Sequence, residues 1–408
     1  MAGVDRTATR ILGFTSPEMD FQLMRQLGAA NAGGGAPGEI FAARGSIDGD
    51  DPYAWPPAFA AQAERLETMA DAALAAGHTV SASQHLLRAS SYYRSAEYFS
   101  DPFKPEGLVF GNKSRNTFVK AAPLLPHHIE AIGIPFDGLE LPGYFMAPAG
   151  GARDGRTVIA MTGFDGTGEE LYFQTAADGL ARGFNVLVAE GPGQVGALRR
   201  YPERPFQPDY EAPIGAIVDY ALTRSDVNAD KLALYGISFG GYFVTRGAAH
   251  DDRLKALIAN SPIVDLLAYM SAFVSAGDDA DDSNEDQDVS LDEVDEVPDD
   301  LMPPAVKLGF KSACRRFAVT SFSGWFEALA AYTVTDDLHR ITCPSLAMVG
   351  VGEGDEALRQ AEVFRTSVAG PVTLRTFDVD DGADMHCQLG NLPLSNAVIY
   401  DWLSDTLG

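Results

Sequence analysis

Cysteine is scarce in this chain: Cys314, Cys343 and Cys387 are the three among 408 residues, and none forms a CxxC pair. Three thiols are too few for a disulfide framework, and the missing pair argues against a zinc ribbon. No stretch approaches the roughly 18 apolar residues that a membrane-spanning helix requires. Met1 to Phe14 also lacks the basic and apolar regions of a secretory signal. We therefore expect a soluble, cytoplasmic protein with no membrane partner.

Positive charge is in short supply as well. Thirty Lys and Arg residues stand against 57 Asp and Glu residues, which gives a net charge of −27. Such a surface repels polyphosphates, so the charge argues against nucleic acid as a partner. The chain is otherwise rich enough in apolar residues, at 46%, to fold around a large core. Its length suits one catalytic domain with an appendage or cap.

About half of the net charge lies in residues 278–300, which contain thirteen acidic residues and no basic one. A block of like charges repels itself, so we expect a mobile, solvated surface insertion that is dispensable for chemistry. A calcium site is the alternative, although the acidic residues lack the Gly-centred spacing of an EF-hand loop. The sequence implies no metal and no organic cofactor.

Hydrophobic periodicity predicts a hairpin of two helices over residues 57–99, joined at Gly77, and a β-hairpin over residues 127–148. Beyond these hairpins, short apolar segments alternate with helical ones. This alternation predicts an α/β protein with a mostly parallel, doubly wound sheet. The predicted strands are 157–162, 185–190, 231–237, 256–261, 345–350 and 373–379.

These patterns predict an N-terminal helical or lid domain over residues 1–126 and a core in two parts, 127–261 and 338–408. Residues 262–337 lack strand signals and form a cap insertion that contains the acidic block. The insertion follows the carboxyl end of a strand, where doubly wound sheets hold their ligands. Its aromatic residues either line an apolar pocket or pack the cap against the core; they are Phe322, Trp325, Phe326 and Tyr332.

A G-x-S-x-G motif follows the strand 231–237 and reads Gly236-Ile237-Ser238-Phe239-Gly240-Gly241. Glycines at these positions let a strand and a helix close around a strained turn. Ser238 then stands at a helix N-terminus, where the helix dipole favours developing negative charge. The motif predicts that Ser238 is a nucleophile; a capping serine in a Gly-rich turn is the alternative.

Acyl transfer also requires donors for an oxyanion. The backbone N–H of Phe239, directly after the nucleophile, is one candidate. The second should come from the loop after the strand 157–162, where we favour the N–H of Phe164 over that of Asp165. Neither nucleotide-binding Gly motif is present in this loop, so a phosphate site is not indicated.

His386 is the candidate base, because it follows the strand 373–379 in the loop where this chain order places a histidine. The acid should follow the strand 345–350 and orient the imidazole. Asp355 stands three residues past Gly352, at the usual spacing, and is our first choice. Glu353 is its rival, and a plain acidic surface loop is the alternative to both.

Four segments together resemble one known family: 163–165, 190–194, 236–241 and 382–388. They are similar to the α/β-hydrolases related to 2,6-dihydroxypseudooxynicotine hydrolase and the fungal yellowish-green pigment hydrolases, and the resemblance covers residues 57–408. The segment 75–94 resembles the helical N-terminal domain of the same family. Glu190, where the family commonly has aspartate, Val195 and the acidic insertion depart from the pattern.

The resemblance implies hydrolysis of a carbon–carbon bond beside a ketone, of retro-Claisen type, in an aromatic or polyketide-like small molecule. Ser238, or a water activated by His386, would attack the carbonyl, with the N–H groups of Phe239 and Phe164 holding the oxyanion. The family also implies a homodimer with N-terminal helices at the pocket mouth. Two alternatives stay open: a carboxylesterase or lactone-forming acyltransferase with the same triad, and a noncatalytic binding protein on a hydrolase fold.

Overall fold

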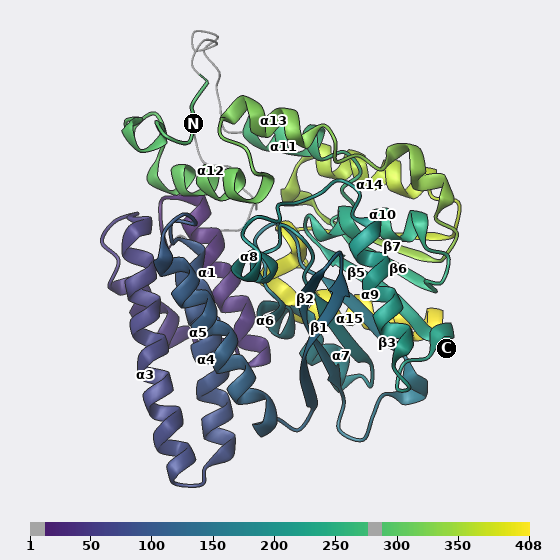
Figure 1. Cartoon of the computed structure of the whole chain (residues 1–408), viewed down its shortest axis with the longest axis horizontal. Coiled ribbons are helices and arrows are strands. Elements are labelled where there is room, and N and C mark those ends of the chain that lie inside the picture. Colours follow the sequence, from purple (N-terminus) through teal and green to yellow (C-terminus); the bar gives the residue numbers. More distant parts are fainter. Residues whose placement is uncertain (1–12, 276–287) are drawn as a thin grey trace.

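A single eight-stranded sheet forms the centre of the computed structural model, which describes residues 13–275 and 288–408 (Figure 1). The strand order is β1-β2-β4-β3-β5-β6-β7-β8. β2 runs antiparallel to both β1 and β4, and the other neighbouring strands are parallel. The bounds are β1 His128–Phe136, β2 Leu139–Ala147, β3 Thr157–Met161, β4 Asn185–Ala189, β5 Leu232–Ile237, β6 Ala256–Asn260, β7 Ser345–Gly350 and β8 Val372–Phe377.

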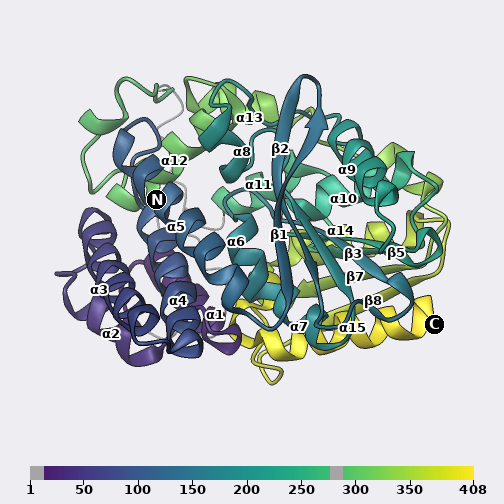
Figure 2. The same cartoon turned by 60° about the horizontal axis from the view of Figure 1, so that its bottom comes forward.

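Helices cover both faces of this sheet, which is why every residue of β3 to β6 is buried. Ile214, Phe243 and Phe364 pack from α9, α10 and α14 on one face. Leu180 and Ile399 pack from α7 and α15 on the other (Figure 2). The core helices are α6 Gly168–Leu171, α7 Ala177–Ala181, α8 Val195–Arg200, α9 Glu211–Thr223, α10 Gly240–His250, α14 Asp355–Ser367 and α15 Leu392–Leu407.

The predicted sheet and both predicted hairpins are confirmed. Each strand from β3 to β8 lies within two residues of its predicted bounds. The helical hairpin turns at Gly77, whose φ of 79° favours glycine, and the β-hairpin turns at Asp137 and Gly138. The N-terminal helices are α1 Pro17–Ala29, α2 Pro37–Gly45, α3 Trp55–Ala75, α4 Thr79–Tyr98 and α5 Pro105–Ala121.

The insertion between β6 and β7 carries α11 (Leu266–Ser275), α12 (Pro304–Phe317) and α13 (Phe322–Leu329), drawn at the top of Figure 1. Its α12 also contacts the N-terminal helices. Leu308 belongs to the same apolar cluster as Trp55, and the Nζ of Lys311 lies 2.9 Å from a carboxylate oxygen of Asp101. The cap therefore packs on the N-terminal helices as well as on the core.

The acidic side chains of residues 288–300 are exposed, as expected of a solvated insertion, but this part of the block is paired and packed rather than a loop of unpartnered like charges. Val294 is fully buried, and carboxylates of Asp295 and Asp299 lie 2.7 Å and 2.6 Å from Lys311 and Lys307. The reason is that α12, outside the block, supplies the cations that the block itself lacks. Residues 278–287, the rest of the block, lie outside the described part, which resumes at Asp288.

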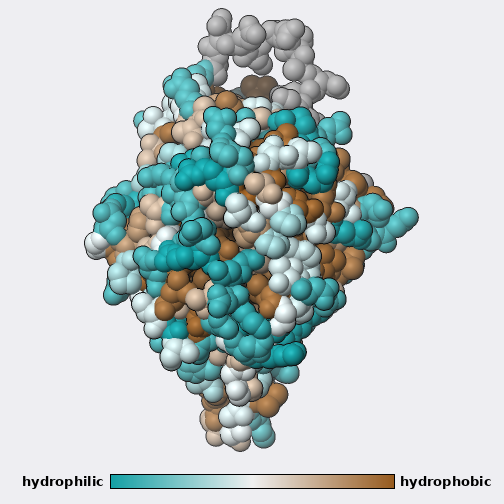
Figure 3. All heavy atoms as spheres, turned by 90° about the vertical axis from the view of Figure 1, so that its right-hand side faces the viewer, coloured by the Kyte–Doolittle hydropathy of each residue, from teal (hydrophilic) through white to brown (hydrophobic). Residues whose placement is uncertain are grey.

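The surface is mixed in character. Figure 3 shows one face on which hydrophilic side chains predominate and hydrophobic ones lie between them in small patches. Within residues 13–275 and 288–408, no helix has both the length and the apolarity that crossing a membrane requires.

The sheet and α10 approach each other closely at the end of β5. A Cβ added to Gly241 would lie 1.8 Å from the carbonyl oxygen of Ser261, and one on Gly236 would lie 2.1 Å from that of Gly240. Backbone atoms fill these spaces, so no side-chain movement can relieve the overlap. Glycine is therefore required at both positions for the turn to form.

We predict that Gly241→Ala lowers the free energy of unfolding by about 1–3 kcal/mol or more, because the added methyl group meets backbone. Gly215→Ala in α9 is the matched control, since a Cβ there meets nothing within 4 Å. That substitution should stabilise the protein by about 0.4–1 kcal/mol. Thermal melts of both variants test the prediction, and an unchanged melt for Gly241→Ala would contradict it.

Candidate active site

Ser238 occupies a sharp turn between the last residue of β5 and the start of α10. Its φ of 61° is in the left-handed region, which a non-glycine residue adopts at a cost. The turn is held by a hydrogen bond of 2.5 Å from the N–H of Ser238 to the carbonyl of Asn260 at the end of β6. The strained backbone thus lifts the Oγ of Ser238 above the carboxyl end of the sheet.

The structure brings His386 to this serine. Its Nε2 lies 2.8 Å from the Oγ of Ser238, and its Nδ1 lies 2.6 Å from a carboxylate oxygen of Glu353. The loop that carries His386 is tied to the acid loop by the N–H of Gly352, which donates to the carbonyl of Asp384 at 2.9 Å. Serine, imidazole and carboxylate therefore form one continuous hydrogen-bonded chain.

The choice of Asp355 as the acid is wrong in this geometry, and its rival Glu353 takes the position. After β7 the chain makes a single turn over Val351–Glu353, which directs Glu353 inward. Gly354, with a φ of 89°, then reverses the chain, so that Asp355 becomes the exposed first residue of α14. The acid comes two residues earlier than the expected spacing, and the longer glutamate side chain spans the distance.

The Glu353 carboxylate is completely shielded from solvent and is held by four donors. Besides His386, it accepts hydrogen bonds from the N–H of Gly350 at 2.8 Å, from the hydroxyl of Tyr269 at 3.1 Å and from the hydroxyl of Ser261. Tyr269 could not be found from the sequence, because it comes from α11 in the cap and stands in no local motif. Such a set of donors fixes the carboxylate in one orientation.

Burial and neighbouring charges shift the pKa values of Glu353 and His386 in opposite directions. Burial favours neutral Glu353, but the adjacent His386 and the donors around the carboxylate lower the pKa of Glu353 below its ordinary value. Burial likewise disfavours protonated His386, but Cys387 and the Glu353 carboxylate raise the pKa of His386. These effects favour an ionised Glu353 beside His386, which is the arrangement that a catalytic base would require.

The predicted oxyanion donors lie beside the turn. A Cβ on Gly163 would come within 2.7 Å of the Cβ of Ser238 and 2.8 Å of the backbone nitrogen of Phe239, so the loop after β3 rests directly on the nucleophile turn. Among the described residues, the N–H groups of Phe164 and Phe239 donate to no other group. Their role in holding an oxyanion stays a prediction.

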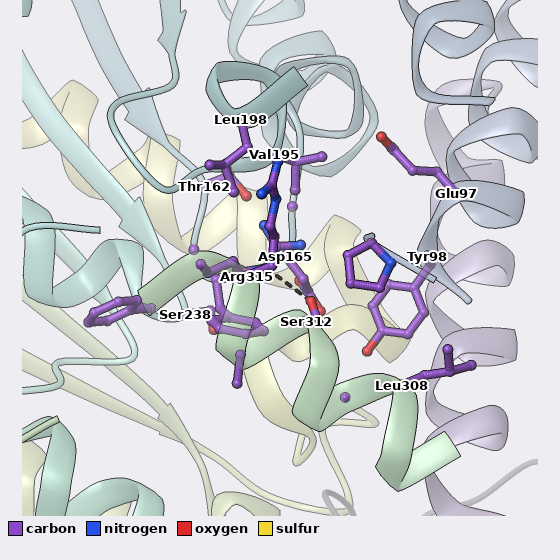
Figure 4. A pocket seen from close by; sticks show the side chains of 18 of the residues that line it. Glu97, Tyr98, Thr162, Asp165, Val195, Leu198, Ser238, Leu308, Ser312 and Arg315 are labelled. Carbon is purple, nitrogen blue, oxygen red and sulfur yellow. Dashed lines mark hydrogen bonds between the residues drawn. The ribbon is translucent and has the colours of Figure 1, made fainter. Parts of the chain in front are cut away.

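A cavity of about 760 Å³ opens over Ser238 and His386. The N-terminal helices, the loop after β3 and the cap all contribute to its wall, and Figure 4 shows α12 passing between Ser238 and Tyr98. Phe322 and Trp325 line the cavity, which agrees with the prediction that the cap aromatics line a pocket. Tyr332 instead packs on Phe239, with ring centroids 5.5 Å apart.

Buried ion pairs connect the N-terminal helices to the loop that lies on Ser238. Arg94 and Arg25 each place a guanidinium nitrogen 2.9 Å from Glu170, and Arg25 also lies 3.2 Å from Asp165. Breaking a buried pair leaves an uncompensated charge, so these contacts fix the loop strongly. Sequence analysis did not single out the helix of Arg25, although Ser16-Pro17-Glu18 is a typical helix start.

Within the described part of the chain, no group of three or more His, Cys, Asp or Glu side chains could hold a metal ion. The buried thiol of Cys387 lies 3.6 Å from the carbonyl of Asn260. It therefore packs beside the histidine loop, as expected for an ordinary thiol.

Known proteins are similar to this chain in sequence and in fold. Residues 174–298 match the prolyl oligopeptidase family. The α/β-hydrolase xenA of Xenoacremonium sinensis is 37% identical over 257 residues, which are 60% of each chain. The solved structure of 2,6-dihydroxy-pseudo-oxynicotine hydrolase superposes with a TM-score of 0.72 at 24% identity, covering 93% of this chain and 95% of that one. The fold is therefore that of the α/β-hydrolases, and the sequence is similar to a fungal α/β-hydrolase over about three fifths of the chain.

A second solved structure, AbyA5, superposes on this α/β-hydrolase fold with a TM-score of 0.64 at 19% identity, over 95% of this chain and 93% of its own. Both structural likenesses include the N-terminal helices. The sequence match is shorter, since the chain spans about three fifths of the length of the curated relatives that it matches. The comparisons therefore support the α/β-hydrolase fold across nearly the whole chain.

For the acid, we predict that Glu353→Gln lowers kcat by about 10⁴-fold, because the amide cannot hold the required imidazole tautomer. Asp355→Asn should leave kcat within about twofold, since its side chain is exposed on α14. Steady-state kinetics of the two variants provide the test. The reverse ranking would return the acid role to Asp355.

The pH dependence follows from the raised pKa of His386. A base must be neutral to accept the proton of Ser238, so activity is present above the pKa of His386 and is lost as the pH falls through it. We predict that kcat/KM reaches half its maximum above about pH 6.5, the ordinary pKa of histidine. A pH–rate profile with its acidic midpoint clearly below that value would contradict the ionised Glu353 beside the imidazole.

Proposed function

We propose that this protein is a serine-type hydrolase that cleaves a carbon–carbon bond beside a ketone in an aromatic or polyketide-like small molecule. The observation that carries the proposal is the hydrogen-bonded chain from Ser238 through His386 to Glu353, which opens into a large cavity. Aromatic and aliphatic side chains such as Phe322 and Leu308 make up much of the wall. A cavity of this kind suits a bulky, largely apolar substrate.

The mechanism begins with the transfer of the Ser238 proton to His386 as the oxygen attacks the ketone carbon. The N–H groups of Phe239 and Phe164 would stabilise the resulting oxyanion. Collapse of the tetrahedral intermediate breaks the adjacent carbon–carbon bond, and His386 returns the proton to the carbanion as it leaves. Water, activated by the same imidazole, then releases the acyl group from Ser238 as a carboxylic acid.

A carbon leaving group is favoured by the likeness to 2,6-dihydroxy-pseudo-oxynicotine hydrolase, which extends over the N-terminal helices that close the cavity. A carboxylesterase or acyltransferase would use the same triad and is the second candidate, because the geometry at Ser238 serves either leaving group. The intact serine, histidine and glutamate chain argues against a noncatalytic binding protein.

The proposal is tested with a panel of aryl 1,3-diketones and p-nitrophenyl esters, with products identified by mass spectrometry in H₂¹⁸O. We expect higher kcat/KM for the diketones and one ¹⁸O atom in the carboxylic acid product. Ser238→Ala should reduce kcat by about 10⁴- to 10⁶-fold, whereas Ser404→Ala on α15, away from the cavity, should have no effect.

Faster cleavage of the esters with no diketone turnover would favour the esterase candidate instead. Retention of more than about a tenth of the rate by Ser238→Ala would show that this serine is not the nucleophile.

A further inference from the structure

The wall of the cavity over Ser238 has a charge opposite to that of the whole chain. The chain carries 30 basic and 57 acidic residues, yet basic side chains outnumber acidic ones in the lining. The basic ones are Arg25, Arg94, Lys104, Arg199, Arg315 and Arg316, and the acidic ones are Glu18, Glu97 and Asp165. Grouping cations in a partly desolvated cavity costs free energy unless protein carboxylates or a bound anion pair with them.

Protein carboxylates compensate four of these cations. The ion pairs are Arg25 with Asp165 and Glu170, Arg94 with Glu97 and Glu170, Arg199 with Glu97 and Glu169, and Lys104 with Asp101. Arg315 and Arg316, consecutive on α12, have no carboxylate within ion-pair distance among residues 13–275 and 288–408. These two arginines are the cations of the described wall that form no ion pair, although the charges of Asp165 and Glu97 still act on Arg316 from farther away.

Arg316 is the better positioned of the two. Its Nε donates to the hydroxyl of Ser312 at 3.1 Å, and one terminal nitrogen lies 3.5 Å from the carbonyl of Gly193. Its guanidinium carbon lies 4.9 Å from the ring centroid of Phe164, on the loop that rests on Ser238. Arg315 makes a looser contact, 5.7 Å from the ring centroid of Phe103.

These contacts leave N–H groups on both terminal nitrogens of Arg316 without an acceptor in the described part of the chain. The two terminal N–H groups of a guanidinium form the planar fork that matches the two oxygens of a carboxylate. Burial lowers the pKa of Arg316, and the charges of Asp165 and Glu97 offset this effect only in part, so the partly exposed guanidinium lacks some of the solvation that it would have in water. An anion at this place would restore the missing solvation.

We propose that the cavity binds substrates that carry a carboxylate, and that Arg316 holds this carboxylate while the ketone lies at Ser238. The position of the ketone rests on the proposed function, whereas the preference for a carboxylate rests on the wall alone. Figure 4 shows Ser312 and Arg315 on α12, with Ser238 on one side and Tyr98 on the other. The anion would thus bind next to α12, near the Phe164 ring and within the cavity that also opens over Ser238.

The test measures binding without turnover, in the full-length Ser238→Ala variant. The probes are 11-(dansylamino)undecanoic acid and its methyl ester, which differ in charge and share the same chain and fluorophore. We expect the acid to bind at least about tenfold more tightly than the ester, as for a charge-assisted two-point contact. Adding Arg316→Gln should reduce this preference to less than about twofold and leave the affinity for the ester unchanged.

Arg315→Gln is the matched control and should retain the preference. Arg316→Lys keeps the charge but loses the fork, so an intermediate preference is expected. Equal affinity of the Ser238→Ala protein for acid and ester would overturn the proposal without any arginine variant, and so would loss of the preference in Arg315→Gln but not in Arg316→Gln. Because no reaction is followed, failure of the proposed carbon–carbon hydrolysis would leave these results unchanged.

Discussion

The close approach of backbone to backbone where β5 turns into α10 is the constraint on which the site depends. Three chain segments meet there with no room for a Cβ: the loop at Gly163, the turn at Gly236 and the first turn of α10 at Gly241. Ser238 accepts a left-handed conformation within this contact. Its hydroxyl is thereby placed against His386, and the loop that would supply an oxyanion donor is brought to the same point.

Side chains from the cap and the N-terminal helices hold the groups around this turn. The buried carboxylate of Glu353 orients His386, and its own donors include Tyr269 from the cap. The N-terminal helices reach the opposite side of the cavity and fix the loop after β3 through Arg25 and Arg94. Because the hydrogen-bonded chain at Ser238, the cap and the N-terminal helices contact one another, the same packing sets the shape of the cavity and the geometry at Ser238.

Much of this arrangement could be predicted from sequence, because the signals are local. Alternating apolar segments gave the sheet, and the glycines around Ser238 predicted the turn that carries it. The spacing favours Asp355, whereas the structure brings Glu353 to His386, because the choice depends on a single turn after β7 that the spacing does not predict. Tyr269 and Arg316 act across the fold from the cap, so only the three-dimensional arrangement reveals them.

The proposed function requires that Ser238 be a nucleophile activated within this chain of hydrogen bonds. Its most direct test is treatment of the intact protein with a fluorophosphonate, followed by mass spectrometry of its peptides. We predict one covalent adduct, on the peptide that contains Ser238, formed more slowly as the pH falls and His386 becomes protonated. Absence of an adduct, or an adduct on another residue while Ser238 stays unmodified, would contradict the account.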